Sequence, residues 1–376
     1  MKDIYISSGN ILTPLGFTSD ENASAMIAGK TGIRHVGDLM LAPSPFYASL
    51  IGSEQLAEKF SAFDDPARFT RFEQMAICSM KDAIASSASD LTGKDTIFVL
   101  STTKGNIDLL RSEPQSNKLY LWNTARLLRD YFHFANEPLV VSDACISGIQ
   151  AILTAARLIS AGFYKKAVIN GTDVISEFVL SGFSSFKSLS TGPCRPFDKT
   201  RDGLSLGEGS GTLILSDEPP AGNIVNIVAG DGFSTNDANH ISGPSRTGEG
   251  LFIAIEKTLK KSGKSVDFIS AHGTATSYND EMESIALTRA GLHNVPVNSF
   301  KGYWGHTLGA AGVIESVMSI WSLTHGILFG TQGFSVSGIT HPLNIIGTAT
   351  KKEISCCLKI ASGFGGCNAA MLFYRK

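Results

Sequence analysis

Four short segments of the sequence carry side chains that could act together on a thioester. They are residues 143–148 (DACISG), 271–276 (AHGTAT), 301–306 (KGYWGH) and 363–366 (GFGG). In this order they supply a thiol, two imidazoles, a lysine and a glycine-rich turn. Carbon–carbon bond formation on a thioester needs a nucleophile and groups that handle protons and developing negative charge. Read together, the four segments predict an enzyme.

Cys145 is the candidate nucleophile. It follows the apolar stretch 138–142 and precedes 149–161, a run rich in alanine and isoleucine that predicts a helix. A tight strand-to-helix turn exposes backbone amides, and these amides and the helix dipole lower a thiol pKa and can bind an oxyanion. A free cysteine is also often a simple core residue. The position at a turn favours the catalytic interpretation.

His272 and His306 are the candidate acid–base or hydrogen-bonding groups. Each follows a short apolar stretch in the second half of the chain and has glycine beside it. A single histidine is usually structural, but two in matching loops, with a thiol in the related loop of the first half, predict a shared site. Lys301 lies in an apolar setting and needs a partner, for which Glu315 on the following helix is the candidate.

Two acidic residues begin the helix that is expected after the His272 loop. Asp280 is expected to cap that helix, which is the usual role of an acid at this position. Glu283 could equally be a second partner of Lys301. The remaining histidines lack the spacing of metal ligands, and no metal site is expected.

The order of predicted elements in the first half of the chain is repeated in the second. A helix and a strand at 72–101 match a helix and a strand at 251–270, and each half ends in a glycine-rich turn and a strand, at 207–216 and 363–373. Alternating strands and helices predict mostly parallel sheets covered on both faces. The repeat therefore predicts two similar α/β sheets that face each other across a shared helical layer.

The junction between the halves is expected at Pro219 and Pro220, which divides the chain into 1–220, with the thiol, and 221–376, with the histidines and Lys301. Segments 38–66 and 172–206 fit the repeat least well. They are expected to be insertions that contact substrate.

Composition excludes several other classes of protein. The 376 residues are 43% hydrophobic and 18% charged, with a formal net charge of −2, so nucleic-acid binding has little electrostatic support. No apolar run is long enough to cross a bilayer and the N-terminus does not resemble a secretion signal. The six cysteines form no CxxC pair. A reducing cytoplasm is the expected setting.

The motifs closely resemble those of the β-ketoacyl-[acyl carrier protein] synthases, elongating ketosynthases of the thiolase-fold condensing enzymes. The elbow at 143–148, the block 195–209 (RPFDKTRDGLSLGEG), the AHGT loop at 271–274, the pattern from Lys301 to Glu315 and the terminal GFGG all match. The resemblance covers nearly the whole chain. It implies a thiolase-like fold, in which two pseudo-symmetric α/β halves form α-β-α-β-α layers.

The resemblance also implies residue roles. Cys145 would be acylated from a carrier-protein or CoA thioester, with the N–H groups of Cys145 and Phe364 as the oxyanion hole. His272 and His306 would assist decarboxylation of malonyl carrier protein, and the enolate would attack the acyl group on Cys145. Phe364 would also gate the acyl pocket.

Other implied features concern orientation and partners. Lys301 and Glu315 would hold the charge of the site, while Thr274 and Thr276 would contact the phosphopantetheine arm of the acyl carrier protein. The chain itself would bind no cofactor. It would form a homodimer, or a heterodimer with a similar subunit, and the apolar strand 167–170 could pair across the two-fold axis. Arginines 68, 71, 126 and 129 are candidates for docking the acidic carrier.

Departures from the family pattern leave the substrate open. Lys104 is expected near the acyl pocket, where it would suit a conjugated acyl chain better than a saturated one. Phe300, Trp304 and Cys367 replace threonines. Chain elongation in fatty acid or in polyene and aryl-polyene synthesis fits best. A thiolase, with Cys367 as the second cysteine, and a chain-length-factor subunit are the alternatives.

Overall fold

The computed structural model describes residues 2–220 and 225–376, so residues 221–224 of the expected junction lie outside the described part. The first half contains eight strands and six α-helices. In chain order they are β1 (Tyr5–Leu12), α1 (Ser19–Ile27), β2 (Arg34–Val36), β3 (Phe46–Ser49), α2 (Ser53–Ser61), α3 (Arg71–Ser87), β4 (Thr96–Ser101), α4 (Leu121–Tyr131), β5 (Leu139–Val141), α5 (Ser147–Ser160), β6 (Lys166–Asp173), α6 (Glu177–Ser185), β7 (Leu206–Gly207) and β8 (Gly209–Ser216).

The second half repeats much of this order. Its elements are β9 (Ile227–Asn236), α7 (Glu249–Ser262), β10 (Phe268–Ser270), α8 (Ser277–Arg289), β11 (Val297–Asn298), α9 (Lys301–Trp304), α10 (Ala311–His325), β12 (Ile327–Leu328), β13 (Thr350–Lys351), β14 (Cys356–Gly363) and β15 (Cys367–Arg375). Several helices begin or end at residues that favour helix ends. Thr70 and Glu73 form a capping box at the start of α3, while Gly263 and Gly326 end α7 and α10 in the left-handed conformation.

One ten-stranded sheet runs through both halves, in the order β11-β10-β14-β15-β9-β1-β8-β6-β4-β5. Read outward from the β9–β1 junction, each half has the same strand order, which shows the expected pseudo-symmetry. A single pair, Tyr5 with Val228, joins β1 to β9. We expected two separate sheets. The two half-sheets are instead joined into one sheet where β1 meets β9.

The prediction of mostly parallel strands was wrong, because the sheet is mixed. β4 pairs in parallel with β5 and β6, and β10 pairs in parallel with β11 and β14. β8 and β15 are antiparallel to their neighbours. In the second half the direction reverses because the turn 363–366 joins β14 to β15 as a hairpin, without a crossover helix. In the first half the longer segment that contains α6 and β7 connects β6 to the antiparallel β8.

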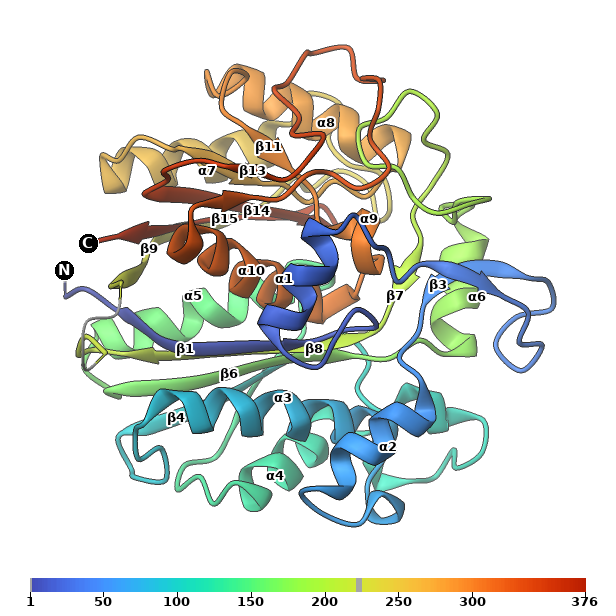
Figure 1. Ribbon diagram of the computed structural model, residues 1–376, viewed down its shortest axis with the longest axis vertical. Helices are drawn as coiled ribbons and strands as arrows, with labels where there is room; N and C mark the ends of the chain where they lie inside the picture. Colours follow the sequence, from blue (N-terminus) through green and yellow to red (C-terminus); the bar gives the residue numbers. More distant parts are fainter. Residues whose placement is uncertain (1, 221–224) are drawn as a thin grey trace.

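The two half-sheets are stacked with helices between and outside them, as α-β-α-β-α layers (Figure 1). Helices α5 and α10 fill the central layer, α7 and α8 cover one outer face, and α2, α3 and α4 cover the other. The largest buried cluster lies in the central layer, and smaller clusters lie under each outer layer. Burial of this apolar surface is the main stabilising contribution.

Two glycines allow the N-terminal ends of α5 and α10 to touch. A Cβ atom on Gly148 would lie 2.5 Å from the backbone nitrogen of Val313, and one on Gly312 would lie 2.5 Å from that of Ile149. Any larger residue at either position would force the helices apart. Because Cys145 precedes α5 and His306 precedes α10, this contact brings the two reactive loops together.

Strand β6, which includes the apolar segment 167–170, is hydrogen-bonded to β4 on one side and to β8 on the other. It therefore has no free edge, and the prediction that this segment pairs across a two-fold axis was wrong. The edge strand in this half is β5. Among the residues described, no helix is both long and apolar enough to cross a membrane.

Candidate active site

Cys145 occupies a tight turn between β5 and α5. Ala144, just before it, has a φ of 44°, an uncommon value for a residue with a side chain. The Ser147 hydroxyl stabilises the turn, accepting from Asp143 N–H at 2.8 Å and donating to the Ala144 carbonyl at 2.6 Å. The turn directs a buried thiol into the cavity described below, where the backbone N–H of Phe364 donates to it.

Burial outweighs the lowering of the thiol pKa that the turn was expected to cause. Burial raises the pKa of Cys145 to about 11, although the charge of Lys301 and the Phe364 N–H act in the opposite direction. Burial dominates because the hydration energy that a thiolate loses on burial is larger than the stabilisation that one amide and one screened cation provide. The turn therefore orients the thiol more than it ionises it.

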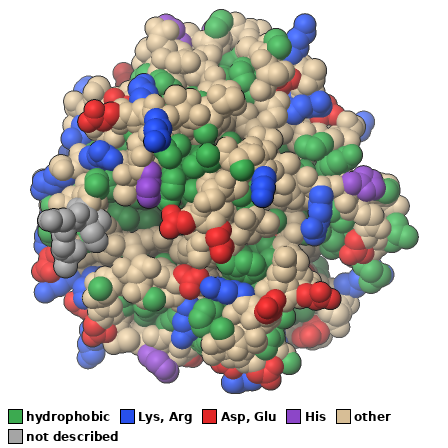
Figure 2. All heavy atoms as spheres, viewed as in Figure 1, with side chains coloured by type: hydrophobic (Ala, Val, Ile, Leu, Met, Phe, Trp, Pro, Cys, Tyr) green, Lys and Arg blue, Asp and Glu red, His purple; other side chains and the backbone are tan. Residues whose placement is uncertain are grey.

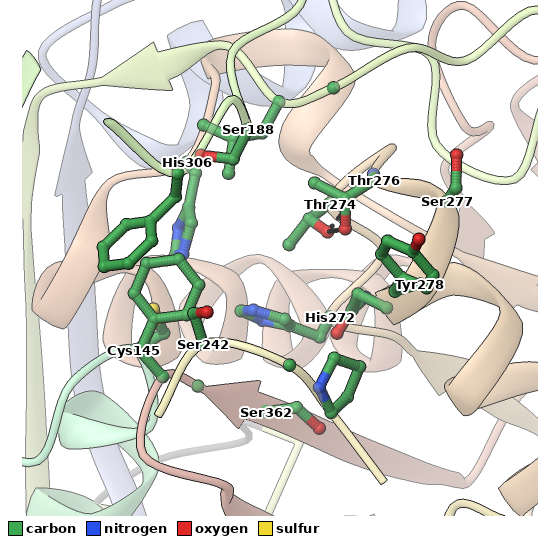
Figure 3. A pocket seen from close by; sticks show the side chains of 18 of the residues that line it. Cys145, Ser188, Ser242, His272, Thr274, Thr276, Ser277, Tyr278, His306 and Ser362 are labelled. Atoms are coloured by element: carbon green, nitrogen blue, oxygen red, sulfur yellow. Dashed lines mark hydrogen bonds between the residues drawn. The ribbon is translucent and has the colours of Figure 1, made fainter. Parts of the chain in front are cut away.

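His272 and His306 lie on either side of the same space as Cys145 (Figure 3). Their ring centroids are 5.1 Å apart and the rings are nearly perpendicular, at 85°. The thiol sulfur and one nitrogen of each ring all lie within 4.8 Å of one another. The structure thus brings together the three residues that the sequence motifs singled out.

Hydrogen bonds to the Nδ1 atoms of His272 and His306 assign the tautomers of both histidines. Leu308 N–H donates to His306 Nδ1 at 3.3 Å, and Lys301 Nζ lies 3.2 Å from His272 Nδ1. An Nδ1 atom that accepts a hydrogen bond leaves the proton on Nε2. Burial, together with the Lys301 charge, holds the pKa of both imidazoles well below 6.5. Both are therefore neutral Nε2–H donors.

These tautomers bear on what the site could hold. The same three side chains are spaced closely enough to ligate a metal ion. A protonated Nε2, however, has no lone pair for a metal, whereas it can donate to an oxygen. The arrangement fits a carbonyl or enolate oxygen better than a cation.

Lys301 and Glu315 form a buried ion pair beside His272. Lys301 Nζ lies 2.7 Å from Glu315 Oε1, and it also donates to the His272 carbonyl at 2.7 Å. The sequence-based pairing of these residues agrees with this geometry. A second lysine, Lys359 of β14, lies 2.7 Å from Glu315 Oε2. Sequence reasoning missed it, although a lone lysine in the apolar run 356–361 was a signal.

Glu283 is not a hydrogen-bonding or ion-pair partner of Lys301. Its carboxylate accepts the N–H groups of His272 and Gly273, both at 2.7 Å. Burial, followed by the charge of Asp280, raises the pKa of Glu283 to about 7. This residue holds the His272 loop in place through its backbone.

Asp280 also holds loops in place, but it does not cap α8, whose N-cap residue Thr276 makes no side-chain cap. It accepts the Thr274 N–H at 3.0 Å and the Phe197 N–H at 2.7 Å. Arg201 lies 3.7 Å away. The expected helix cap is thus a tether between the His272 loop and the segment that contains Phe197 and Arg201.

The cavity in front of these residues has a volume of about 420 Å³. Thr274 and Thr276 line it, and their hydroxyl oxygens are 2.9 Å apart. Phe364 lines it as well, with Phe183 stacked on its ring at 5.4 Å and Phe186 edge-on at 5.1 Å. Both of these phenylalanines belong to the insertion 172–206, which therefore does contribute to the cavity, whereas 38–66 does not.

Lys104 does not line this cavity. Its side chain is exposed, and Nζ lies 3.4 Å from the carbonyl of Thr103. The expectation that Lys104 faces the acyl group therefore has no support in the geometry of this chain. The side chain turns outward, where its charge is hydrated.

Cys367 lies behind the glycine turn, outside the cavity lining. Its sulfur donates to the Phe364 carbonyl at 3.3 Å, and burial raises its pKa. A thiol that lies outside the cavity and donates to a carbonyl is poorly placed to act as the second catalytic cysteine of a thiolase.

The fold and the site define a thiolase-fold condensing enzyme. The family model described as "Beta-ketoacyl synthase, N-terminal domain" matches residues 1–221, and "Beta-ketoacyl synthase, C-terminal domain" matches residues 225–335. The chain belongs to the β-ketoacyl synthase family and is an acyl-transferring enzyme.

Individual relatives agree with this assignment. The chain is 29% identical to 3-oxoacyl-[acyl-carrier-protein] synthase 2 of Synechocystis sp., over 99% of this chain and 98% of the relative. It is 27% identical to the enzyme of the same name from Vibrio cholerae, over 99% of each chain. A chain in the structure of a ketosynthase in complex with its chain length factor, from Xenorhabdus doucetiae, has a TM-score of 0.85 at 27% identity, over 100% of this chain and 98% of that one.

Proposed function

We propose that the protein is an elongating β-ketoacyl-[acyl carrier protein] synthase that uses Cys145 as its nucleophile. The observation that carries the proposal is the convergence of the Cys145 thiol, two neutral imidazole N–H groups and the Phe364 N–H on one cavity. A nucleophile between two sets of hydrogen-bond donors suits a reaction in which two different carbonyl oxygens become negative in turn.

Cys145 is acylated first. Its sulfur bonds to the acyl carbon, the carbon–sulfur bond to the carrier breaks, and the thiol proton leaves with the carrier thiol. The N–H groups of Cys145 and Phe364 bind the oxyanion of this step. Because the thiol pKa is about 11, we expect the proton to leave as the new bond forms, with little free thiolate beforehand.

Malonyl carrier protein reacts next. The bond to its carboxylate breaks, carbon dioxide leaves, and the electron pair becomes an enolate whose oxygen accepts the Nε2–H bonds of His272 and His306. The enolate carbon then attacks the acyl carbon on Cys145, the Cys145 carbon–sulfur bond breaks, and the thiolate takes up a proton from solvent. Thr274 and Thr276, at the cavity, would hydrogen-bond the phosphopantetheine arm.

Two sets of variants test these roles. Cys145→Ala should abolish condensation while the protein stays folded, because the replacement leaves only a small cavity. His272→Ala and His306→Ala should each slow malonyl decarboxylation by about 10²- to 10³-fold and slow acylation much less. Intact-protein mass spectrometry with a panel of acyl carrier proteins measures acylation. Product formed by Cys145→Ala, or normal decarboxylation in a histidine variant, contradicts the assigned role.

Docking of an acidic carrier requires a cation near the cavity. The four arginines expected to do this are each paired with a carboxylate: Arg68 with Asp64, Arg71 with Glu208, Arg126 with Glu137, and Arg129 with Asp130 and Glu137. Basic and acidic side chains are interspersed over the face in Figure 2. Lys187 lines the cavity and makes no ion pair within the described residues. We therefore assign the carrier phosphate to Lys187 in place of the arginines.

A dimer, of two copies or with a similar subunit, is part of the proposal. Among the described residues, strand β5 pairs only with β4 and leaves its other edge free, with Leu139 38% exposed. An unpaired edge with an apolar side chain is a natural site for pairing with another chain. The chain-length-factor alternative is disfavoured by the presence of Cys145 at the head of the cavity.

A further inference from the structure

A fully buried ammonium group lies next to the proposed active site and has no part in the reaction above. Lys359, in the middle of β14, has no exposed surface. Four oxygen atoms surround its Nζ: the carbonyls of Ile360 at 2.9 Å and of Ser270 and Ala271 at 3.2 Å each, and Glu315 Oε2 at 2.7 Å. A buried charge of this kind is costly to keep unless its partners are well placed.

The contacts of Glu315 connect this ammonium group to His272. One carboxylate oxygen, Oε1, is held by Lys301, which in turn contacts His272 Nδ1. The other oxygen, Oε2, has no hydrogen-bond donor in the described residues, and its close contact is the charge of Lys359. Fixing both oxygens prevents rotation of the carboxylate.

Charge neutralisation alone does not account for Lys359. Lys301 and Glu315 already form a neutral pair. Lys359 thus brings a second cation to a carboxylate that already has one, while its other acidic neighbour, Glu283, acts on it only through its charge. A second cation is understandable if the orientation of the carboxylate matters to the site.

We propose that Lys359 is a positioning residue, a covalently tethered cation that fixes Glu315 so that Lys301 keeps the Nε2–H of His272 directed at the substrate. The inference rests on the role proposed above for His272. It adds a residue to the site that none of its loop motifs contains.

The oxygen cage gives this inference a specific chemical consequence. Truncation by Lys359→Ala leaves three carbonyl oxygens and one carboxylate oxygen around a space the size of an ammonium group. Such an all-oxygen site suits a free monovalent cation. Ammonium or potassium ions should therefore replace the lost side chain, whereas tetramethylammonium, which is larger and has no N–H group, should not.

The test compares wild type, Lys359→Ala and the matched control Lys257→Ala, which removes an exposed lysine on α7. Malonyl carrier protein decarboxylation and Cys145 acylation are measured in ammonium chloride and in tetramethylammonium chloride at equal ionic strength. We expect Lys359→Ala to lose up to about 10²-fold in decarboxylation in tetramethylammonium, with acylation much less affected. Ammonium should restore the rate saturably in this variant alone.

Several results would overturn the inference. They are normal decarboxylation by Lys359→Ala, equal loss of both activities, or the same response to the two salts. If Lys359→Ala folds only with ammonium, as judged by circular dichroism, the tethered-cation assignment is supported. If it folds in neither salt, the test uses Lys359→Met, which keeps the length of the side chain but not its charge. A larger loss of decarboxylation than of Cys145 acylation in this variant supports the inference, and an equal loss of both contradicts it. Failure of the proposed function itself would appear in the wild type, which would then not decarboxylate malonyl carrier protein.

Discussion

Replacing Phe186 with alanine should loosen the aromatic contacts that hold Phe364. The Phe364 ring is bounded by Phe183 at 5.4 Å and Phe186 at 5.1 Å. An aromatic pair stabilises its arrangement by about 0.5–1.5 kcal/mol beyond the area it buries. Loss of the Phe186 pair should therefore raise the population of displaced Phe364 by about 2- to 13-fold. Because Phe186 is 47% exposed, we expect the lower part of that range.

The assay is single-turnover acylation of Cys145 by a medium-chain acyl carrier protein, followed by intact-protein mass spectrometry. If Phe364 gates the pocket, Phe186→Ala should accelerate acylation by about 2- to 5-fold. Phe178→Ala is the matched control, since Phe178 is a similarly exposed phenylalanine on α6. An equal effect in the control, or an undiminished effect of Phe186→Ala in a Phe364→Ala background, would refute the reasoning.

Three further predictions concern ionisation and assembly. The rate of Cys145 alkylation by iodoacetamide should rise about tenfold per pH unit from pH 7 to 10, because the thiol pKa is about 11; a plateau below pH 9 contradicts this. The pKa of Glu283 is raised from 4.5 to about 7, so the native state binds its proton more tightly than the unfolded state does. The contribution of this carboxyl to the free energy of unfolding should therefore fall by up to about 3 kcal/mol as the pH rises from 4.5 to about 7. Glu283→Gln should lack this slope in urea denaturation at pH 5 and pH 8, and an unchanged slope would count against it. Leu139→Lys, on the edge strand β5, should shift sedimentation toward monomer; an unaltered dimer would place the interface elsewhere.

The loops that carry chemistry were predictable because each follows a short apolar stretch and contains a strong local motif. Cys145, His272 and His306 needed only the repeat in element order to be placed in related loops. Their convergence within 4.8 Å follows from the contact of Gly148 with Gly312, and both glycines were part of the motifs. Local sequence and overall fold agree most closely at these positions.

Features that depend on distant partners could not be predicted in this way. Lys359 acquires its role from Glu315, 44 positions away, and from carbonyls of the neighbouring strand β10. The direction of the Lys104 side chain depends on packing around its loop, which the sequence pattern does not show. The pKa of Cys145 depends on burial, which outweighs the local turn. Strand direction was predicted from the alternation of strands and helices alone, which does not show that the last strand of each half runs antiparallel.

The neutral state of the two histidines is required by the chemistry proposed for them. An imidazolium next to a nascent enolate is acidic enough to protonate its carbon and so to destroy the nucleophile before it attacks the acyl group. A neutral imidazole N–H can stabilise the oxyanion by a hydrogen bond but is too weak an acid to transfer its proton. Burial, followed by the charges of Lys301 and Lys359, lowers the pKa of both imidazoles and so keeps them neutral. The same two charges favour an enolate that forms beside them. Burial and the two lysines therefore act in the same direction on the site: they keep the donors neutral, and the lysines stabilise developing negative charge.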